Sequence, residues 1–388
     1  MKTWKLYGLI ILFTLPGGCI EPFTPEIKNY EDLLVVEALI TDEASTQFVR
    51  LTRSHPLDTS IINFERGASI LLTNSTGNDY IFRESTQGLY SPDPGSFTPV
   101  PGEIYTLFIT TFDGRTYSSD PVTMKITPPI QDLYFERMSV PSDETGDLDD
   151  GLQILINTGT ESSDPGYYKF DWEETYELET PYYSFFDYDY QTQEIIERKD
   201  NINSCWSGSI STNLNIASSE NLSNDIIYEH PIRFIPFRDP MLKIRYSILV
   251  KQSSLSEESF RFWQNLKESN ESTGSLYDAQ PFQVIGNIKN VNDPSEPVLG
   301  YFDMTTVSSK RIFISGREDI PEGVRVPSPY ANCLIGADSI VTARNVPGML
   351  NIGYLISREL LGVGFEVVIR SCIDCRLKGI NVKPEFWE

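Results

Sequence analysis

The stretch IYTLFITTFDGRTYSS, residues 104–119, gives the clearest indication of the fold class. Its two halves are strand-like runs, and Asp113-Gly114 between them is a dipeptide typical of a tight hairpin turn. The earlier runs 68–73 and 79–82 flank a second turn sequence, NSTGN at 74–78. Short strands with a turn about every eight to twelve residues are typical of a β-sandwich. We therefore predict an Ig-like β-sandwich in this part of the chain.

The predicted sandwich domain spans residues 32–128, and the sequence TPP at 127–129 marks its end. Strand-like runs continue beyond this point, so residues 129–388 are predicted to form a larger, β-rich C-terminal domain. The predicted fold class is mainly β: an N-terminal Ig-like β-sandwich, followed by a larger β-rich domain that contains one short α-helix.

The helix is predicted near residues 255–268. Ser254 and Glu257 have the spacing of a capping box, in which two side chains satisfy amides at the start of a helix. Phe262 and Leu266 form an apolar pair one turn apart, as expected for a helix with one buried side.

The charge balance excludes one class of partner. The chain has 388 residues with 31 basic and 55 acidic side chains, a formal net charge of -24. Such a chain repels phosphates and shows no basic stripe, so we expect no nucleic-acid partner. Hydrophobic residues make up 40%, which is ordinary for a globular protein and too many for a disordered one.

The first residues are typical of an export signal. Two lysines precede the apolar run 6–15, which is too short to span a bilayer but suits a signal peptide at 1–18. The sequence PGGC at 16–19 resembles the bacterial lipobox, so Cys19 is the predicted lipid attachment site and 19–31 a tether. An ordinary cleaved signal with a chance cysteine is the alternative. We expect a lipid-anchored outer-membrane protein, on either the periplasmic or the surface face.

The cysteine count agrees with this interpretation. If Cys19 carries lipid, an even number remains, namely Cys205, Cys333, Cys372 and Cys375. In an oxidising compartment these are candidates for two disulfides. The CxxC spacing of the last two also allows a redox pair or half of a zinc site. We favour structural disulfides, with at least one of the CxxC cysteines joined to Cys333 or Cys205.

Other candidate sites are weaker. Asp147 and Asp149, followed by Gly151, are similar to calcium-binding loops, but the closing glutamate of such a loop is missing. A solvated acidic loop is therefore favoured over a metal site. Metalloprotease, nucleophile-elbow and phosphate-loop motifs are absent from the sequence, and no cofactor is expected.

The segment YYSFFDYDY, residues 182–190, is unusually aromatic. In an extended strand, alternation would place Tyr182, Phe186, Tyr188 and Tyr190 on one face and Tyr183 on the other. One interpretation is that these side chains belong to a core. The other is that their exposed end forms a platform for a protein or sugar partner.

Several motifs occur in the order of one known pattern. They are VVEALITD (35–42), RYSILVKQ (245–252), GSLYDAQP (274–281), CIDCR (372–376) and NVKPEFW (381–387). Together they resemble the Bacteroidota lipoprotein family defined by domain of unknown function 4249, over nearly the whole mature chain.

The resemblance implies an outer-membrane lipoprotein of a kind often encoded beside TonB-dependent receptors. It supplies no catalytic residues, and its one departure, Ala279 in place of the usual proline, affects no functional position. We expect a non-enzymatic envelope lipoprotein, anchored in the membrane by its lipid. Its expected role is to assist a TonB-dependent receptor by capturing ligand or bracing the complex. The alternatives are a hydrolase of glycans or peptides without a recognisable motif, and a structural or adhesive envelope protein.

Overall fold

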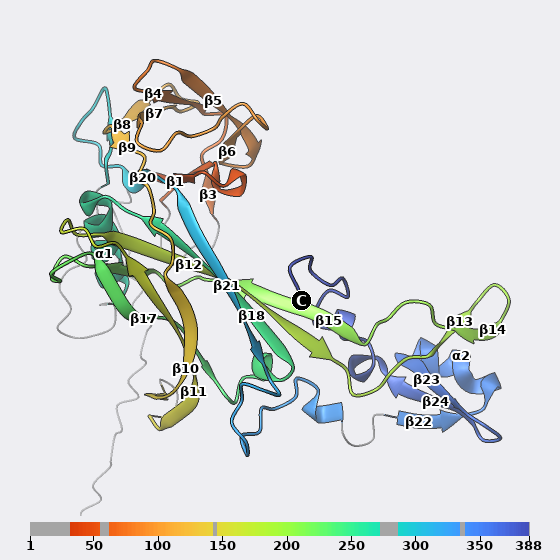
Figure 1. The fold of residues 1–388 in the computed structure, drawn as a ribbon. Helices are drawn as coiled ribbons and strands as arrows, with labels where there is room; N and C mark the ends of the chain where they lie inside the picture. The colour runs from red at the N-terminus through yellow and green to blue at the C-terminus, as the bar shows by residue number, and fades with distance from the viewer. Residues whose placement is uncertain (1–31, 55–61, 143–145, 272–285, 334–337, 388) are drawn as a thin grey trace, which may run out of the picture.

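The structure is a computed structural model that describes residues 32–54, 62–142, 146–271, 286–333 and 338–387. The described chain forms an N-terminal unit, a central unit with long strands, and a small C-terminal lobe (Figure 1). Most of the regular structure is strand, so the predicted mainly β fold class is confirmed. Neither helix in these ranges has the length and hydropathy that crossing a membrane requires.

The N-terminal unit is one curled sheet with the strand order β19-β8-β7-β4-β5-β6-β2-β1-β20, to which β3 and β9 add short pairings. A 3-10 turn, η1 (Ala44–Thr46), lies between its first two strands. The strands are β1 (Leu34–Thr41), β2 (Val49–Arg53), β3 (Asn63–Phe64), β4 (Ser69–Asn74), β5 (Asp79–Thr86), β6 (Leu89–Pro92), β7 (Ile104–Thr110), β8 (Thr116–Ser119), β9 (Val122–Thr123), β19 (Ile288–Asn290) and β20 (Leu299–Thr305).

Hydrogen bonds close this sheet around a single core. The hairpin of residues 104–119 forms as expected, with Thr110 opposite Thr116. At the two ends of the strand order, Asn287 beside β19 exchanges hydrogen bonds of 2.8 and 2.9 Å with the backbone of Phe302 in β20. The enclosed side chains include Leu34, Val36 and Phe302, all essentially without solvent exposure.

Two strands of the N-terminal sheet come from late in the chain. β20 runs parallel to β1, from Val35 opposite Leu299 to Thr41 opposite Thr305, and β19 pairs with β8. Both strands lie within the range 129–388, so the sheet extends beyond the predicted limits of 32–128. Parallel partners are joined by long crossovers, so no local turn signal announces this pairing.

The central unit is a sandwich of two sheets, β10-β11-β17 and β15-β12-β18-β21, with β16 added to β12. Its core lies between them and includes Ile154, Phe170, Ile235 and Ile248, each fully buried. The strands are β10 (Asp132–Pro141), β11 (Leu148–Gly159), β12 (Tyr167–Glu179), β15 (Ser204–Ile210), β16 (Asn215–Ser218), β17 (Ile226–Pro236), β18 (Arg245–Ser254) and β21 (Val307–Ser315).

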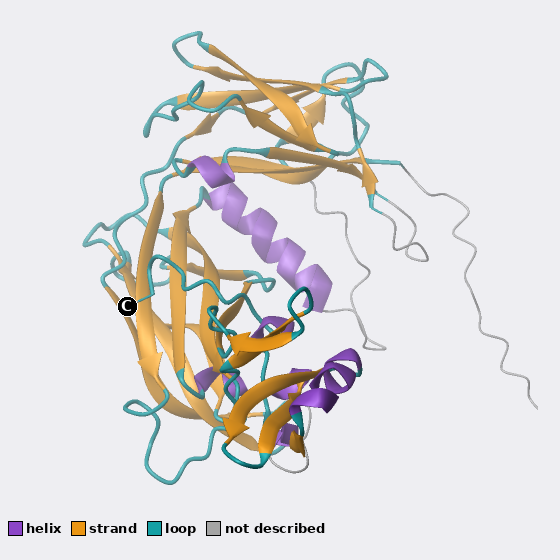
Figure 2. Cartoon of the chain, turned by 90° about the vertical axis from the view of Figure 1, so that its right-hand side faces the viewer, coloured by secondary structure: helices purple, strands orange, loops and turns teal. Residues whose placement is uncertain are grey.

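Helix α1 (Glu257–Glu271) lies between the N-terminal and central units (Figure 2). It begins later than predicted, and its cap is Ser256, whose hydroxyl accepts a hydrogen bond of 3.0 Å from the Ser259 amide. The predicted cap, Ser254, is the last residue of β18, and its amide bonds to the Thr127 hydroxyl. The capping-box prediction was therefore wrong, because the Ser254 amide that the box required is already bonded to the Thr127 hydroxyl.

The C-terminal lobe contains a three-stranded sheet in the order β22-β24-β23, the hairpin β13–β14 and a short helix. One of the two disulfides, Cys333–Cys372, lies within it, and the other, Cys205–Cys375, joins it to β15. Its elements are β13 (Phe186–Asp189), β14 (Glu194–Glu197), β22 (Asp338–Val341), α2 (Val346–Asn351), β23 (Tyr354–Leu360) and β24 (Gly364–Ile369).

Candidate functional site

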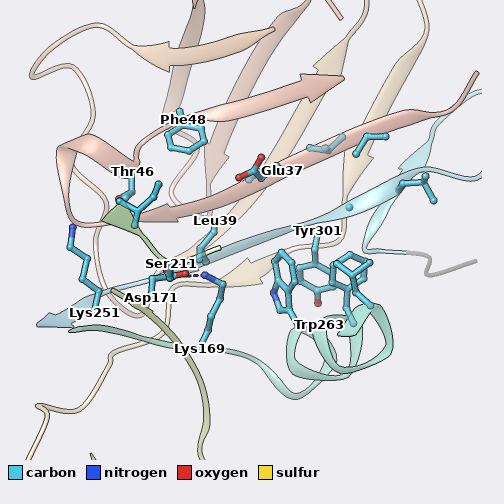
Figure 3. A pocket seen from close by; sticks show the side chains of 18 of the residues that line it. Glu37, Leu39, Thr46, Phe48, Lys169, Asp171, Ser211, Lys251, Trp263 and Tyr301 are labelled. Atoms are coloured by element: carbon cyan, nitrogen blue, oxygen red, sulfur yellow. Dashed lines mark hydrogen bonds and ion pairs between the residues drawn. The ribbon is translucent and has the colours of Figure 1, made fainter. Parts of the chain in front are cut away.

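A cleft of about 910 Å³ lies where the N-terminal unit, the central unit and α1 meet (Figure 3). Its walls come from β1 and β20 on one side, β12 and β18 on another, and α1 on the third. No local stretch of sequence forms this cleft, because its walls come from positions between residues 35 and 301.

The wall from the N-terminal unit is the outer face of its sheet. Alternation along β1 buries Leu34 and Val36 in the core and turns Val35, Glu37 and Leu39 outward, onto the cleft. Since the outward residues include a valine and a leucine, both faces of this strand are largely apolar. Such a strand is expected where both faces are covered.

The helix wall is aromatic. Phe262 packs against Tyr301 of β20 with 5.1 Å between ring centroids, and burial raises the pKa of Tyr301 to about 12. Trp263 lies beside them, and its buried indole N–H has no hydrogen-bond partner among the described residues. An unpartnered buried donor of this kind is costly to the stability of the fold.

Charged side chains line the remaining wall in ion pairs. The Lys251 ammonium lies 2.8 Å from Glu173 and 3.0 Å from Glu43, and Lys169 pairs with Asp171. Burial alone would lower the pKa of Lys251, but the bonds to both glutamates outweigh it and raise the pKa. Because Glu43 belongs to the N-terminal unit, this lysine links two units across the cleft.

A buried carboxyl lies where β20 meets the start of α1. Asp303 is fully buried, and burial raises its pKa to about 6. One of its oxygens accepts a hydrogen bond of 2.8 Å from the Met304 amide, whereas the other has no partner among the described residues. Ser259 and the Ser256 amide, at the start of α1, lower the pKa of Asp303, but their effect is smaller than that of burial.

Asp303 should make the free energy of unfolding depend on pH. Its pKa is raised above the ordinary aspartate value of 3.8, so its stabilising effect is complete below about pH 4 and is lost as pH rises through 6. Relative to Asp303→Asn, we expect the free energy of unfolding of the wild type to fall by about 3 kcal/mol across this range. Urea unfolding at several pH values measures the difference. The exposed Glu258→Gln is the control, and an equal pH slope in wild type and Asp303→Asn would contradict the assignment.

The aromatic segment 182–190 lies in the C-terminal lobe, away from the cleft. Tyr182, Phe186 and Tyr188 are half-buried and pack against the lobe's two apolar clusters. Tyr183 and Tyr190 are exposed, at 44% and 63%. The half-buried Tyr182, Phe186 and Tyr188 and the exposed Tyr183 therefore follow the predicted alternation. Tyr190 lies just past the end of β13. Their role as a partner platform stays a prediction.

The acidic positions are arranged as follows. Asp149 forms an ion pair of 2.8 Å with Arg238, and exposed Asp147 accepts a hydrogen bond from the Ser142 amide through its carbonyl. No group of three or more potential metal ligands occurs among the described residues.

Cys19, the signal peptide 1–18 and the tether 19–31 lie outside the described residues.

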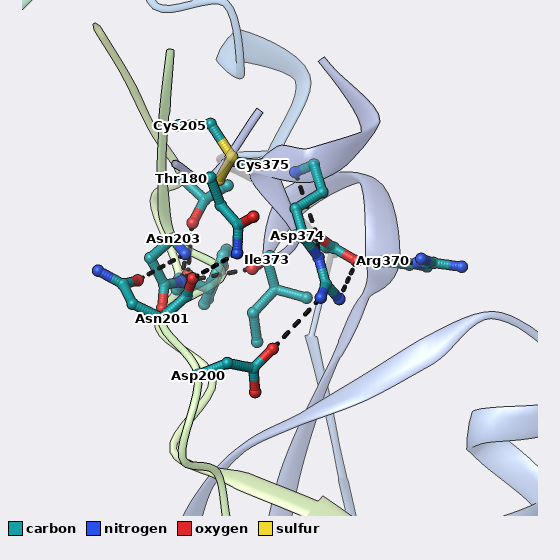
Figure 4. Close-up of a disulfide and its surroundings, with 12 residues drawn as sticks. Thr180, Asp200, Asn201, Asn203, Cys205, Arg370, Ile373, Asp374 and Cys375 are labelled. Atoms are coloured by element: carbon teal, nitrogen blue, oxygen red, sulfur yellow. Dashed lines mark hydrogen bonds and ion pairs between the residues drawn. A yellow bond between two sulfur atoms is a disulfide. The ribbon is translucent and has the colours of Figure 1, made fainter. Parts of the chain in front are cut away.

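The other four cysteines form two disulfides, and a buried carboxylate, that of Asp374, lies next to one of them, Cys205–Cys375 (Figure 4). The pairs are Cys205–Cys375 and Cys333–Cys372, so each CxxC cysteine is joined to a cysteine earlier in the chain. Asp374, between the CxxC cysteines, is fully buried and accepts side-chain hydrogen bonds of 2.8 and 3.0 Å from Arg376 and 3.0 Å from Arg370. Because all three residues lie within 370–376, these bidentate, charge-assisted bonds stiffen the segment that carries Cys375.

The sequence analysis did not identify the cleft. Trp263 was interpreted only as part of a helix pattern, and Leu39 only as part of a strand. One available signal was the apolar character of both faces of VVEALI, residues 35–40, which indicates a strand covered on both sides. That signal indicates burial, and it does not reveal which elements provide the cover.

The comparisons with known proteins concern the part of the chain that builds the cleft. A search of curated proteins finds no match. A family model described as a domain of unknown function, DUF4249, matches residues 20–311 and so includes all the cleft-lining residues. Since this match covers well over half of the sequence, the chain belongs to the DUF4249 family.

Proposed function

We propose that this protein is a non-enzymatic, lipid-anchored protein of the Bacteroidota outer membrane that captures a ligand for a TonB-dependent transporter. The cleft between the N-terminal unit, the central unit and α1 is the proposed capture site. The observation that carries the proposal is the chemistry of this cleft: apolar and aromatic walls, with charged side chains already engaged in ion pairs. Walls of this kind favour binding of an apolar molecule.

Two sequence features support the envelope part of the proposal. The lipobox-like sequence ending in Cys19 follows an apolar run of signal-peptide length. The chain belongs to the DUF4249 family. The expected association with a TonB-dependent receptor comes from the resemblance to this same family. The aromatic segment 182–190 is a second proposed contact, on the C-terminal lobe.

The proposal predicts a specific complex. The affinity-tagged full chain, isolated from outer membranes in mild detergent, should co-purify with one TonB-dependent receptor in near-stoichiometric amount. Mass spectrometry of the eluate identifies it. The exposed pair Tyr183→Ala/Tyr190→Ala should lower the recovery at least about fivefold, because exposed aromatic side chains are frequent interface anchors.

A matched pair of exposed apolar residues controls for this loss. Ile104 and Phe108 lie on the outer face of the N-terminal sheet, at 42% and 41% exposure, and their alanine variants should keep the receptor. Unchanged melting temperatures exclude unfolding as the cause. Absence of any TonB-dependent receptor from the wild-type eluate would contradict the proposal.

A further inference from the structure

We propose that one end of the N-terminal unit rests on the membrane, where the exposed side chains of Phe112, Val291 and Ile62 enter the boundary between lipid headgroups and acyl chains. The partner is a phospholipid surface with zwitterionic headgroups. The inference rests on the lipid anchor of the proposed function and goes beyond it, because it states which part of the protein faces the lipid.

The direction of the strands defines this end. The closed sheet of the N-terminal unit has two ends, and at one of them β1, β4, β8 and β20 begin while β2, β7 and β19 end. We call it the anchor end, and its described residues are 32–34, 53–54, 62–68, 84–88, 110–116 and 290–298.

The predicted tether joins the fold at the anchor end. β1 begins there at Leu34, opposite Arg53 at the end of β2. Fully extended, residues 19–31 reach at most about 45 Å. Acyl chains on Cys19 therefore keep the anchor end within that distance of the bilayer.

The opposite end of the sheet is joined to the central unit. There Asp42, just after β1, accepts a hydrogen bond of 2.9 Å from the Val307 amide. The next residue, Glu43, pairs with Lys251 of β18. The eight residues of β1 separate this junction from the anchor end by about 25 Å. The end nearest the predicted lipid is thus not the end that carries the central unit.

Apolar side chains project from the anchor end. Phe112, in the turn between β7 and β8, is 85% exposed, and Val291, just after β19, is 58% exposed. The two lie on neighbouring strand ends, because the Val291 amide donates a hydrogen bond of 2.8 Å to the carbonyl of Thr116. Ile62, just before β3, is 56% exposed. Such side chains gain free energy when they leave water for the apolar edge of a bilayer. Three of them bind too weakly to replace acyl chains, so this contact orients a protein that the lipid holds.

The charges of the anchor end select the headgroup. Its described arginines all form ion pairs: Arg53 with Glu65, Arg66 with Glu84, and Arg115 with Asp113 and Glu296. Exposed Asp32 and Asp293 add further negative charge. Acidic side chains therefore outnumber basic ones among the described residues of this end. An anionic headgroup would be repelled, whereas a zwitterionic one would not.

The test uses the mature, lipidated protein reconstituted into vesicles of phosphatidylcholine and phosphatidylethanolamine. Phe112→Cys supplies a free thiol for a nitrobenzoxadiazole fluorophore, because Cys19 is the proposed lipid site and the other four cysteines form disulfides. A lipid with a nitroxide on its upper acyl chain should quench at least about half of the emission, since interfacial side chains are buried about 5–10 Å deep. Raising the salt concentration from about 0.1 M to about 1 M should not change the quenching, because the contact is apolar.

The same label at other exposed apolar positions provides the controls. Val100→Cys places it in the loop between β6 and β7, at the opposite end, and Ile81→Cys places it on the outer face of β5. Both should show less than about one fifth of the quenching seen at position 112.

A second set of variants tests the contribution of Phe112 itself. With the label on Val291→Cys, the added change Phe112→Ser should lower the quenching at least about twofold, because it removes the largest apolar side chain of the contact. Phe108→Ser, on the outer face of β7, removes the same side chain elsewhere on the sheet and should leave the quenching unchanged.

Three results would overturn the inference: quenching at position 112 no greater than at position 100, loss of the quenching at high salt, or stronger quenching in vesicles of anionic phosphatidylglycerol. Mass spectrometry of the mature protein reports separately whether Cys19 carries acyl chains. A protein without them refutes both the anchor of the proposed function and this inference. A lipidated protein without quenching at position 112 refutes this inference alone.

Discussion

The Cys19→Ala variant is expected to leave the membrane fraction if its signal peptide is removed, and otherwise to stay unprocessed. Bacterial lipoproteins carry two or three acyl chains on this cysteine, and more than one chain makes attachment effectively permanent. Without the acyl chains, residues 1–31 could hold the protein at a membrane through the apolar run 6–15 of the signal peptide. Fractionation with immunoblotting should show the ratio of soluble to membrane-bound protein rise by at least about tenfold.

The size of the variant distinguishes the possible outcomes. A membrane-bound species that keeps the signal peptide indicates blocked processing, which also follows from loss of the cysteine. Gly18→Ala keeps a small residue before Cys19 and should stay processed and membrane-bound. A lipidated, mature-sized form of Cys19→Ala, identified by mass spectrometry, would refute the assignment.

Removal of the Cys205–Cys375 disulfide by the double alanine variant should cost about 4 kcal/mol of the free energy of unfolding of the region it closes. The two cysteines are 170 residues apart, and the bridge joins β15 to the end of the C-terminal lobe. A disulfide that closes a long loop lowers the conformational entropy of the unfolded chain strongly. Removing the disulfide restores that entropy and so lowers the free energy of unfolding. Denaturant unfolding monitored by tryptophan fluorescence measures the change, because Trp206 follows Cys205 in β15 and packs against Trp387.

The second disulfide provides a matched control. Cys333 and Cys372 are 39 residues apart, so their removal should cost about 1 kcal/mol less than removal of the longer bridge. Both bridges end in the segment 372–375, and they close loops of very different length. A larger loss for the shorter bridge would contradict the entropic explanation.

Local features of the fold were predictable from the sequence. The hairpin of residues 104–119 forms because Asp113-Gly114 suits a tight turn and the flanking runs alternate between buried and exposed positions. The helix near 255–268 was also identified, although its start was misplaced. Ser254 has the right spacing for a cap, but pairing of β18 extends through it. Competition between a strand and a cap is settled by tertiary contacts, which spacing does not encode.

Non-local features were not predictable. The parallel pairing of β1 with β20 joins residues more than 250 positions apart, and the intervening sequence carries no mark of it. The cleft was missed for the same reason, because Leu39, Trp263 and Lys251 meet only after the N-terminal and central units have formed. The aromatic segment was identified as unusual, and its alternation correctly separated Tyr182, Phe186 and Tyr188 from Tyr183.

The pairing of β1 with β20 also has a consequence for the order of events during synthesis. The first strand leaves the ribosome early, whereas its parallel neighbour is made only when residues 299–305 appear. Until then one edge of β1 has no backbone partner, and unpaired edges are prone to association with other chains. The N-terminal unit is therefore completed late, which makes a nascent chain halted before residue 288 a natural substrate for chaperones.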